Sequence, residues 1–297
     1  IKDINNPEND KDTSGGKEIN KEEYVYKEEL LDLGYDVKDV ELISTKISNV
    51  DVKKYLLTEK YKDISMFISS PYYKVENTMR YQKYYDKHSD YTTDNVVIYV
   101  EIGLDNEFYT DPVEITNYND VDALVNKYHK LPSKYEADDL VTLSKKYSSR
   151  GHKIKKIASE PLMKMIDAAR EDGINLLVIS GYRTESTQSG LYNYSVKKNG
   201  VEHALLYSAK PGYSEHQLGL AVDLNETEER FDQTKEYKWL KANSYKYGFI
   251  ERYPKGKEFI TGYGYEPWHY RYLGVDLATK VFIENVTYEE YLIIHSK

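Results

Sequence analysis

The sequence contains no cysteine among its 297 residues. This absence excludes disulfides, thiolate metal ligands, iron–sulfur clusters and a cysteine nucleophile. The chain as given also has no apolar run near the length of about 18 residues that a membrane-spanning helix needs. Basic residues are in the minority, since 41 Lys and Arg stand against 50 Asp and Glu, a formal net charge of −9. Such a charge repels phosphates, so we expect neither nucleic acid nor an acidic membrane surface as a partner.

Phenylalanine and tryptophan are scarce, with 6 and 2 residues, whereas tyrosine supplies 32. Tyrosine must therefore fill part of the core. Its ring buries well only where the hydroxyl meets water or a hydrogen-bond partner, so we expect many half-buried aromatic positions. The length suits one large domain or two smaller ones.

The chain divides into three parts by composition. Residues 1–23 carry few large apolar side chains and are expected to form a flexible linker. Residues 24–124 contain short segments whose apolar residues recur at spacings of three and four, which predicts a small all-helical domain without evident chemistry. Gly34 and Gly103 are expected to end helices there.

Residues 125–297 have an α+β pattern, and helices and strands are expected to alternate along them. One helix is expected to begin at Ser159 and Pro161 and to end at Gly173. Further helices are expected over 184–198, 201–209 and 234–247, and from Val275 onward. Strands are expected over 174–179, 218–224, 249–253 and 268–273, the last two with alternating faces.

Three short segments concentrate polar residues of the types that an enzyme needs. They are Ser-Gly-Tyr-Arg at 180–183, a stretch from Ser214 to Asp223, and Glu-Pro-Trp-His at 266–269. Together the last two supply the imidazoles of His216 and His269 and the carboxylate of Asp223. Two nitrogens and one oxygen, completed by a water, favour catalytic zinc over calcium or magnesium.

The spacing within these segments makes further predictions. His216 and Asp223 are seven residues apart, so an unbroken strand would send them to opposite faces. Gly219 is the expected bend, which would leave His216 on a loop and Asp223 on a strand.

Glu266 and Arg183 are the candidates for the remaining chemistry. Pro267 is expected to keep Glu266 out of the strand ladder, so that its carboxylate lies beside the metal and takes a proton from a zinc-bound water. Arg183 follows an apolar run and suits a carboxylate or the oxyanion of a tetrahedral intermediate.

The order of these motifs carries a resemblance to a known family. Ser-Glu-His-x-x-Gly-x-Ala-x-Asp, preceded by Ser-Gly-Tyr-Arg and followed about 40 residues later by Glu-Pro-Trp-His-Tyr-Arg, resembles the VanY-type carboxypeptidases of the LAS metallopeptidases. The resemblance covers residues 125–297. It implies a LAS-type α+β zinc peptidase fold, with an antiparallel sheet and flanking helices, that removes the terminal D-alanine from peptidoglycan stem peptides.

The resemblance also implies roles for individual residues. Glu266 would be the catalytic base, and Arg183 would contact substrate or the developing oxyanion. Gln188 and Ser214 fall where family members place substrate-binding groups. The implied zinc ligands are His216, Asp223 and His269.

The implied substrate sets an expected location. Peptidoglycan lies outside the cytoplasmic membrane, so we expect an extracytoplasmic enzyme, at the cell surface or secreted, of a Gram-positive bacterium. The sequence begins without Met, and a membrane or wall anchor is expected to precede the linker in a segment outside the given chain.

Several alternatives stay open at the level of sequence. An L,D-carboxypeptidase acting on tetrapeptide stems or a peptidoglycan endopeptidase would use the same zinc residues, and the loops 197–213 and 226–234 that would discriminate between them carry no interpretable signature. A non-catalytic wall-binding protein would keep the fold alone. The segment from Gly212 to His216 superficially resembles the nucleophile elbow of serine hydrolases, but histidine stands where that motif has its second glycine.

Overall fold

The computed structural model describes residues 25–296, and the linker expected over 1–23 therefore lies outside the described residues.

The first part of the described chain is helical, and residues next to the helix starts in the sequence cap the helices. Asp36 and Thr92 accept hydrogen bonds from the backbone N–H groups of Asp39 and Asn95. Its elements are α1 (Lys27–Asp32), α2 (Val37–Lys46), α3 (Asn49–Asp51), η1 (Val52–Leu56), α4 (Ile64–Ser69), η2 (Val75–Asn77), α5 (Thr78–Lys87) and α6 (Thr93–Ile102).

Glycines end two of these helices as the sequence predicts. Gly34 follows the last turn of α1 with φ +91°, and Gly103 caps α6 with φ +101°. Both angles are in the left-handed region that glycine tolerates best. The helices end at Ile102, and residues 103–124 contain only β1 (Val113–Glu114) as regular structure. This strand pairs in parallel with β2 (His129–Lys130).

The remainder of the chain is an α+β unit built on a four-stranded antiparallel sheet in the order β5-β6-β8-β7. A hairpin-like pair, β3 and β4, precedes it. The elements are β3 (Leu140–Thr142), β4 (Lys153–Lys155), α7 (Lys156–Glu171), β5 (Val178–Ser180), α8 (Glu185–Asn199), α9 (Val201–Tyr207), α10 (Glu215–Leu218), β6 (Ala221–Leu224), η3 (Glu229–Gln233), α11 (Lys235–Asn243), η4 (Ser244–Tyr247), β7 (Phe249–Tyr253), α12 (Glu258–Thr261), β8 (Glu266–Tyr272), α13 (Val275–Glu284) and α14 (Tyr288–Ile294).

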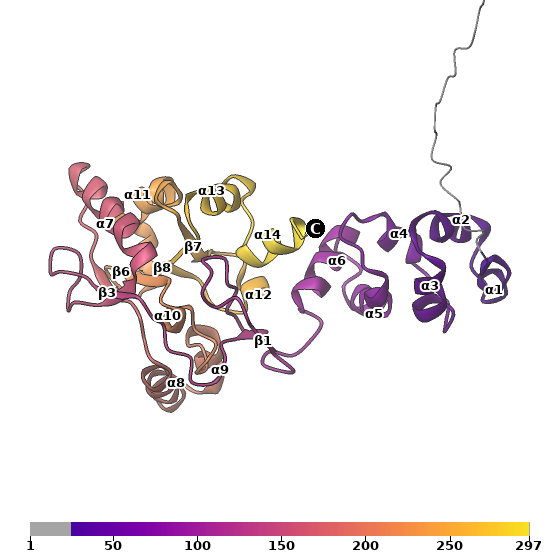
Figure 1. Cartoon of the computed structure of the whole chain (residues 1–297), viewed down its shortest axis with the longest axis horizontal. Coiled ribbons are helices and arrows are strands. Elements are labelled where there is room, and N and C mark those ends of the chain that lie inside the picture. The colour runs from indigo at the N-terminus through magenta and orange to yellow at the C-terminus, as the bar shows by residue number, and fades with distance from the viewer. Residues whose placement is uncertain (1–24, 297) are drawn as a thin grey trace, which may run out of the picture.

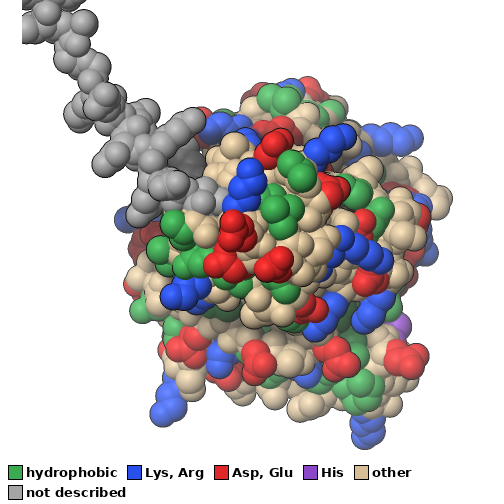
Figure 2. All heavy atoms as spheres, turned by 90° about the vertical axis from the view of Figure 1, so that its right-hand side faces the viewer, with side chains coloured by type: hydrophobic (Ala, Val, Ile, Leu, Met, Phe, Trp, Pro, Cys, Tyr) green, Lys and Arg blue, Asp and Glu red, His purple; other side chains and the backbone are tan. Residues whose placement is uncertain are grey.

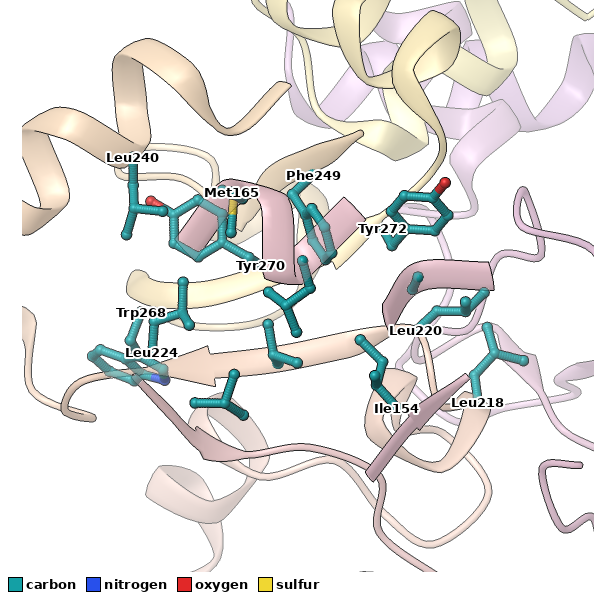
Figure 3. Packing of buried hydrophobic residues seen from close by; sticks show 14 of the residues in the cluster. Ile154, Met165, Leu218, Leu220, Leu224, Leu240, Phe249, Trp268, Tyr270 and Tyr272 are labelled. Carbon is teal, nitrogen blue, oxygen red and sulfur yellow. The ribbon is translucent and has the colours of Figure 1, made fainter. Parts of the chain in front are cut away.

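The main hydrophobic core lies on one face of this sheet, under α7 and α11. Met165 of α7 and Leu240 of α11 pack in one cluster with Phe249, Tyr270 and Trp268 of the sheet (Figure 3). Because residues two apart on a strand share a face, positions 268, 270 and 272 of β8 all point into this core. The alternation expected for this strand is confirmed, since 269 and 271 point the other way.

Both faces of the sheet are nonetheless buried. All seven residues of β8 are buried. On the face opposite the main core, Ile250 of β7 packs in a separate cluster with Ala278 of α13 and Tyr288 of α14. Tyrosine fills deep positions as well as half-buried ones, since Tyr81, Tyr270 and Tyr288 have no exposed surface.

Several expected element boundaries are wrong. The helix expected to begin at Ser159 starts at Lys156, directly after β4, and keeps Pro161 in its interior. The strand expected over 174–179 is confined to Val178–Ser180, and the one expected over 218–224 is divided into the end of α10 and β6. The last helix expected from Val275 is confirmed, and a second helix, α14, follows it.

The helical part adjoins the sheet unit through α14, which lies beside α6 in Figure 1. Ile293 and Ile294 pack against the cluster that holds Val96 and Val100 of α6, and the rings of Tyr99 and Phe259 meet edge to face at 5.3 Å. Figure 2 shows acidic, basic and hydrophobic side chains interspersed over the helical end of the molecule. The helices of residues 25–296 are all too short or too polar to span a bilayer.

Gly219 provides a test of the turn between α10 and β6. Its φ is +80°, and a Cβ there would lie 3.2 Å from Lys155 Cγ and 3.3 Å from Leu140 Cδ2. Gly219→Ala should lower the free energy of unfolding by about 1–2 kcal/mol, because the left-handed conformation is strained for alanine. Urea denaturation with a metal chelator present measures this.

Gly190 in α8 is the matched control. Within the described chain, no atom outside its own helix and neighbours lies within 4 Å of a Cβ built there. Gly190→Ala should therefore raise the free energy of unfolding by roughly 0.5–1 kcal/mol, because alanine favours the helix. Equal effects of the two substitutions would contradict the assigned strain.

Candidate active site and metal centre

Three side chains predicted as zinc ligands converge at one end of the sheet. Asp223 of β6 and His269 of β8 are paired residues on adjacent antiparallel strands. His216 lies on the short helix α10 and not on a loop, which corrects the expectation. The left-handed turn at Gly219 supplies the expected bend. One ligand atom from each of the three residues lies within 4.8 Å of the others, and all three residues are buried.

The two histidines present different ring nitrogens to the centre. Nδ1 of His216 lies 2.8 Å from the carbonyl oxygen of Gly181, which accepts its hydrogen and leaves Nε2 facing Asp223. His269 has the opposite arrangement, because its Nε2 lies 3.4 Å from Glu215 Oε2 and its Nδ1 faces Asp223. Each outer hydrogen bond fixes which nitrogen carries a lone pair toward the centre.

The spacing of these atoms fits a zinc ion. Asp223 oxygens lie 3.2 Å from His216 Nε2 and 3.2 Å from His269 Nδ1. Ligand atoms of a tetrahedral zinc site with bonds of about 2.0–2.2 Å are separated by about 3.3 Å. Among residues 25–296, no group hydrogen-bonds to the buried His216 Nε2 or Asp223 Oδ1. Buried polar atoms rarely lack a partner, and a metal would supply one.

Glu266 lies beside the same centre. It is the first residue of β8 and pairs with Tyr253 of β7, so the expectation that Pro267 keeps it out of the ladder is wrong. Its carboxylate is nevertheless close to the ligands, with Oε2 at 3.6 Å from His269 Nδ1. In the metal-free protein, burial raises the pKa of Glu266 to about 8, despite the opposing charge of His269.

The three predicted ligands have different pKa values without a metal. Burial, reinforced by the charge of Arg183, lowers the pKa of His216 to about 4. Burial opposes protonation of His269 too, but the neighbouring carboxylates of Asp223 and Glu215 stabilise its protonated ring and raise its pKa to about 9. Burial would raise the pKa of Asp223, but the two imidazoles hold it well below the usual value.

Arg183, Gln188 and Ser214 line one cavity of about 660 Å³ together with the three predicted ligands and Glu266. Arg183 Nη2 lies 4.0 Å from Asp223 Oδ2, and the backbone N–H of Arg183 donates to the carbonyl of His216. Gln188 donates from Nε2 to the carbonyl of Ala209 at 2.8 Å. Its buried Oε1 has no hydrogen-bond partner among residues 25–296.

Some residues of the site were missed by the sequence reasoning. The Tyr253 ring lies 4.8 Å from the His269 ring, and nothing in the sequence around it signals that proximity. Glu215 directly precedes His216, a predicted ligand, and this adjacency is the one sequence signal that could have placed Glu215 near the site. His203 and Tyr207 of α9 line the cavity, as do residues 227–230, so both loops considered for specificity contribute to its wall.

Comparisons with known proteins identify the family to which the chain is related. The family model for VanY, D-alanyl-D-alanine carboxypeptidase, matches residues 151–275. The putative carboxypeptidase YodJ of Bacillus subtilis is 40% identical over 207 residues, which cover 64% of this chain and 76% of YodJ. A D-alanyl-D-alanine carboxypeptidase of Enterococcus faecalis is 42% identical over 178 residues, which cover 57% of this chain and 64% of the relative.

Solved structures give the same result. The LdcB LD-carboxypeptidase aligns with a TM-score of 0.56 and 40% identity over 63% of this chain and 93% of LdcB. A mutant of the D,D-pentapeptidase VanY in complex with Zn(II) aligns with a TM-score of 0.51 and 41% identity over 58% of this chain and 98% of VanY.

The fold, the site and these relatives define a zinc metallocarboxypeptidase of α+β architecture. Within that class, the chain belongs to the VanY family of D-alanyl-D-alanine carboxypeptidases.

Zinc binding should be linked to proton release. At pH 7 the metal-free His269 is protonated, because its pKa is about 9, whereas His216 is already neutral. Zinc must displace the proton on His269, so its apparent affinity should rise about tenfold per pH unit from 6.5 and level off above pH 9. Calorimetry in buffers of different ionisation enthalpy should count at least one proton released at pH 7. An affinity that is constant across this range would contradict the assignment.

Proposed function

We propose that this chain removes the terminal D-alanine from peptidoglycan stem peptides that end in D-Ala-D-Ala, with His216, Asp223 and His269 holding the zinc ion. The observation that carries the proposal is the convergence of three buried candidate ligand atoms beside the acidic side chain of Glu266 in one cavity. When bound, zinc supplies Lewis-acid polarisation and a water of lowered pKa.

Glu266 is the proposed proton carrier. Its carboxylate oxygen Oε2 lies 3.6 Å from Nδ1 of His269, the proposed ligand atom, so it would border the position at which zinc would hold a water. A carboxylate there takes a proton from the attacking water and later delivers it to the leaving amine. Burial supports this role, because a desolvated carboxylate is a stronger base than one in water.

Arg183 and two polar side chains are proposed to bind the substrate. The guanidinium of Arg183 faces the ligands and suits either the terminal carboxylate of the stem peptide or the oxyanion that forms during hydrolysis. Gln188 Oε1 is a buried acceptor without a partner among residues 25–296, which suits a peptide N–H. Ser214 lines the same cavity at the start of α10.

The proposed substrate also sets the proposed location and organisation. Because peptidoglycan lies outside the cytoplasmic membrane, the enzyme acts in an extracytoplasmic compartment. Residues 125–297 form the catalytic unit in this proposal, and residues 24–124 precede it as a separate part, most of it helical.

Substitutions separate the roles of base and ligand. Glu266→Ala should retain zinc while kcat falls by about 10²–10⁴-fold, the usual contribution of a general base. His216→Ala should lose the metal itself, and His203→Ala, which alters a cavity histidine outside the group of candidate ligand atoms, should keep it. Elemental analysis and release of D-alanine from a pentapeptide measure the two properties. Near-normal turnover by zinc-loaded Glu266→Ala would refute its role.

The stem peptide that is cut tests the proposal directly. The zinc-loaded protein should shorten pentapeptide stems by one alanine and leave tetrapeptide stems intact, as mass spectrometry of the two incubated separately would show. An L,D-carboxypeptidase is the second candidate, because LdcB is 40% identical. Loss of alanine from the tetrapeptide would establish that activity instead, and no change in either stem would overturn both.

A further inference from the structure

A cluster of four buried charged side chains lies behind the metal centre, and the mechanism above does not use it. Two carboxylates and two guanidiniums balance one another there, and no side chain in it is more than 1% exposed, with Arg271 and Arg252 at 0%. We call it the buried ion cluster. Its members are Glu215 of α10, Arg252 of β7, Arg271 of β8 and Glu289 of α14.

The guanidinium groups of both arginines in this cluster are held by hydrogen bonds. Arg252 donates from Nε to Glu215 Oε1 at 2.8 Å, and from Nη1 and Nη2 to the two oxygens of Glu289 at 2.8 and 2.6 Å. Arg271 donates from Nη1 to Glu215 Oε1 at 2.8 Å, and from Nη2 to the carbonyls of Val121 and Ala123. Both arginines therefore converge on the same oxygen of Glu215.

The other oxygen of Glu215 is directed at a metal ligand. Glu215 Oε2 lies 3.4 Å from His269 Nε2. A carboxylate present only to neutralise arginines gains most by giving both oxygens to them, in the bidentate manner of Glu289. Here the arginines hold one oxygen in place and leave the second for the imidazole.

We propose that Glu215 is a positioning residue for the metal centre: it accepts the Nε2 hydrogen of His269 and so keeps the Nδ1 lone pair directed at the zinc. This rests on the proposed role of His269 as a ligand. His216 needs no such side chain, because the Gly181 carbonyl does the same for it. Outer partners of this kind orient ligand rings and strengthen metal binding.

The support for His269 also extends beyond the residues that match the family model. Glu289 anchors Arg252 from α14, and Val121 and Ala123 anchor Arg271, whereas the model matches 151–275. Asn126 donates to Glu289 as well. Segments on both sides of the matched region thus hold the carboxylate that orients one ligand.

Glu215→Gln in the chain of residues 1–297 tests the proposal. An amide oxygen is a weaker acceptor than a carboxylate, so the zinc dissociation constant should rise by about 10–100-fold, as chelator competition measures. Glu290→Gln is the matched control, because it makes the same change at a buried carboxylate of α14 that accepts from Lys257 and from the backbone N–H of Thr287, outside the buried ion cluster, and it should leave zinc affinity near the wild-type value. Circular dichroism establishes that each variant is folded. Wild-type zinc affinity in folded Glu215→Gln would overturn the proposal, as would an equal loss in both variants.

A measurement on the wild-type protein decides the question if Glu215→Gln does not fold. Proton–nitrogen correlation of the histidine rings in the zinc-loaded protein should show a slowly exchanging Nε2–H on His269 and metal-shifted Nδ1. The reverse pattern would overturn the proposal. His269→Ala separates this inference from the proposed function: retention of zinc by that variant would mean that the metal site itself is misassigned, whereas loss of zinc there with none in Glu215→Gln would reject only the role of Glu215.

Discussion

The pairing of Asp223 with His269 across β6 and β8 is the constraint on which the rest of the site depends. Directly opposed residues of antiparallel strands point to the same face, so this register places a carboxylate and an imidazole side by side. A slip of one residue would turn His269 toward the apolar core and destroy the site. The helices α7 and α11, which bury the other face, therefore secure the register as well as the stability of the sheet.

The same two-residue period explains how a buried charged layer coexists with a hydrophobic core. His269 and Arg271 share one face of β8, whereas Trp268, Tyr270 and Tyr272 share the other. The sheet is therefore apolar toward α7 and charged toward α10. Isolated charges are costly to bury, and this layer is tolerated because its carboxylates and guanidiniums satisfy one another.

Motif spacing was enough to predict which residues meet, because each candidate ligand lies on or next to a regular element. The sequence did not predict the backbone position of Glu266. Pro267 was expected to keep Glu266 out of the strand ladder, whereas Glu266 is the first residue of β8 and pairs with β7. Nor did the sequence predict the convergence of Glu215, Arg252 and Glu289, which come from three elements far apart in the chain. Local patterns carry no information on such tertiary pairs.

Helix α10 shows how one short element can reach both imidazoles of the proposed metal site. Successive residues of a helix point about 100° apart, so Glu215 and His216 leave α10 in different directions. The His216 ring lies beside Asp223 at the centre, whereas the Glu215 carboxylate lies beside Nε2 of His269, on the side of that ring away from the centre. Gly219 then turns the chain at once into β6, which brings Asp223 back to the same centre. Because ligand, support and turn occupy nine consecutive residues, displacing α10 would disturb both imidazoles together.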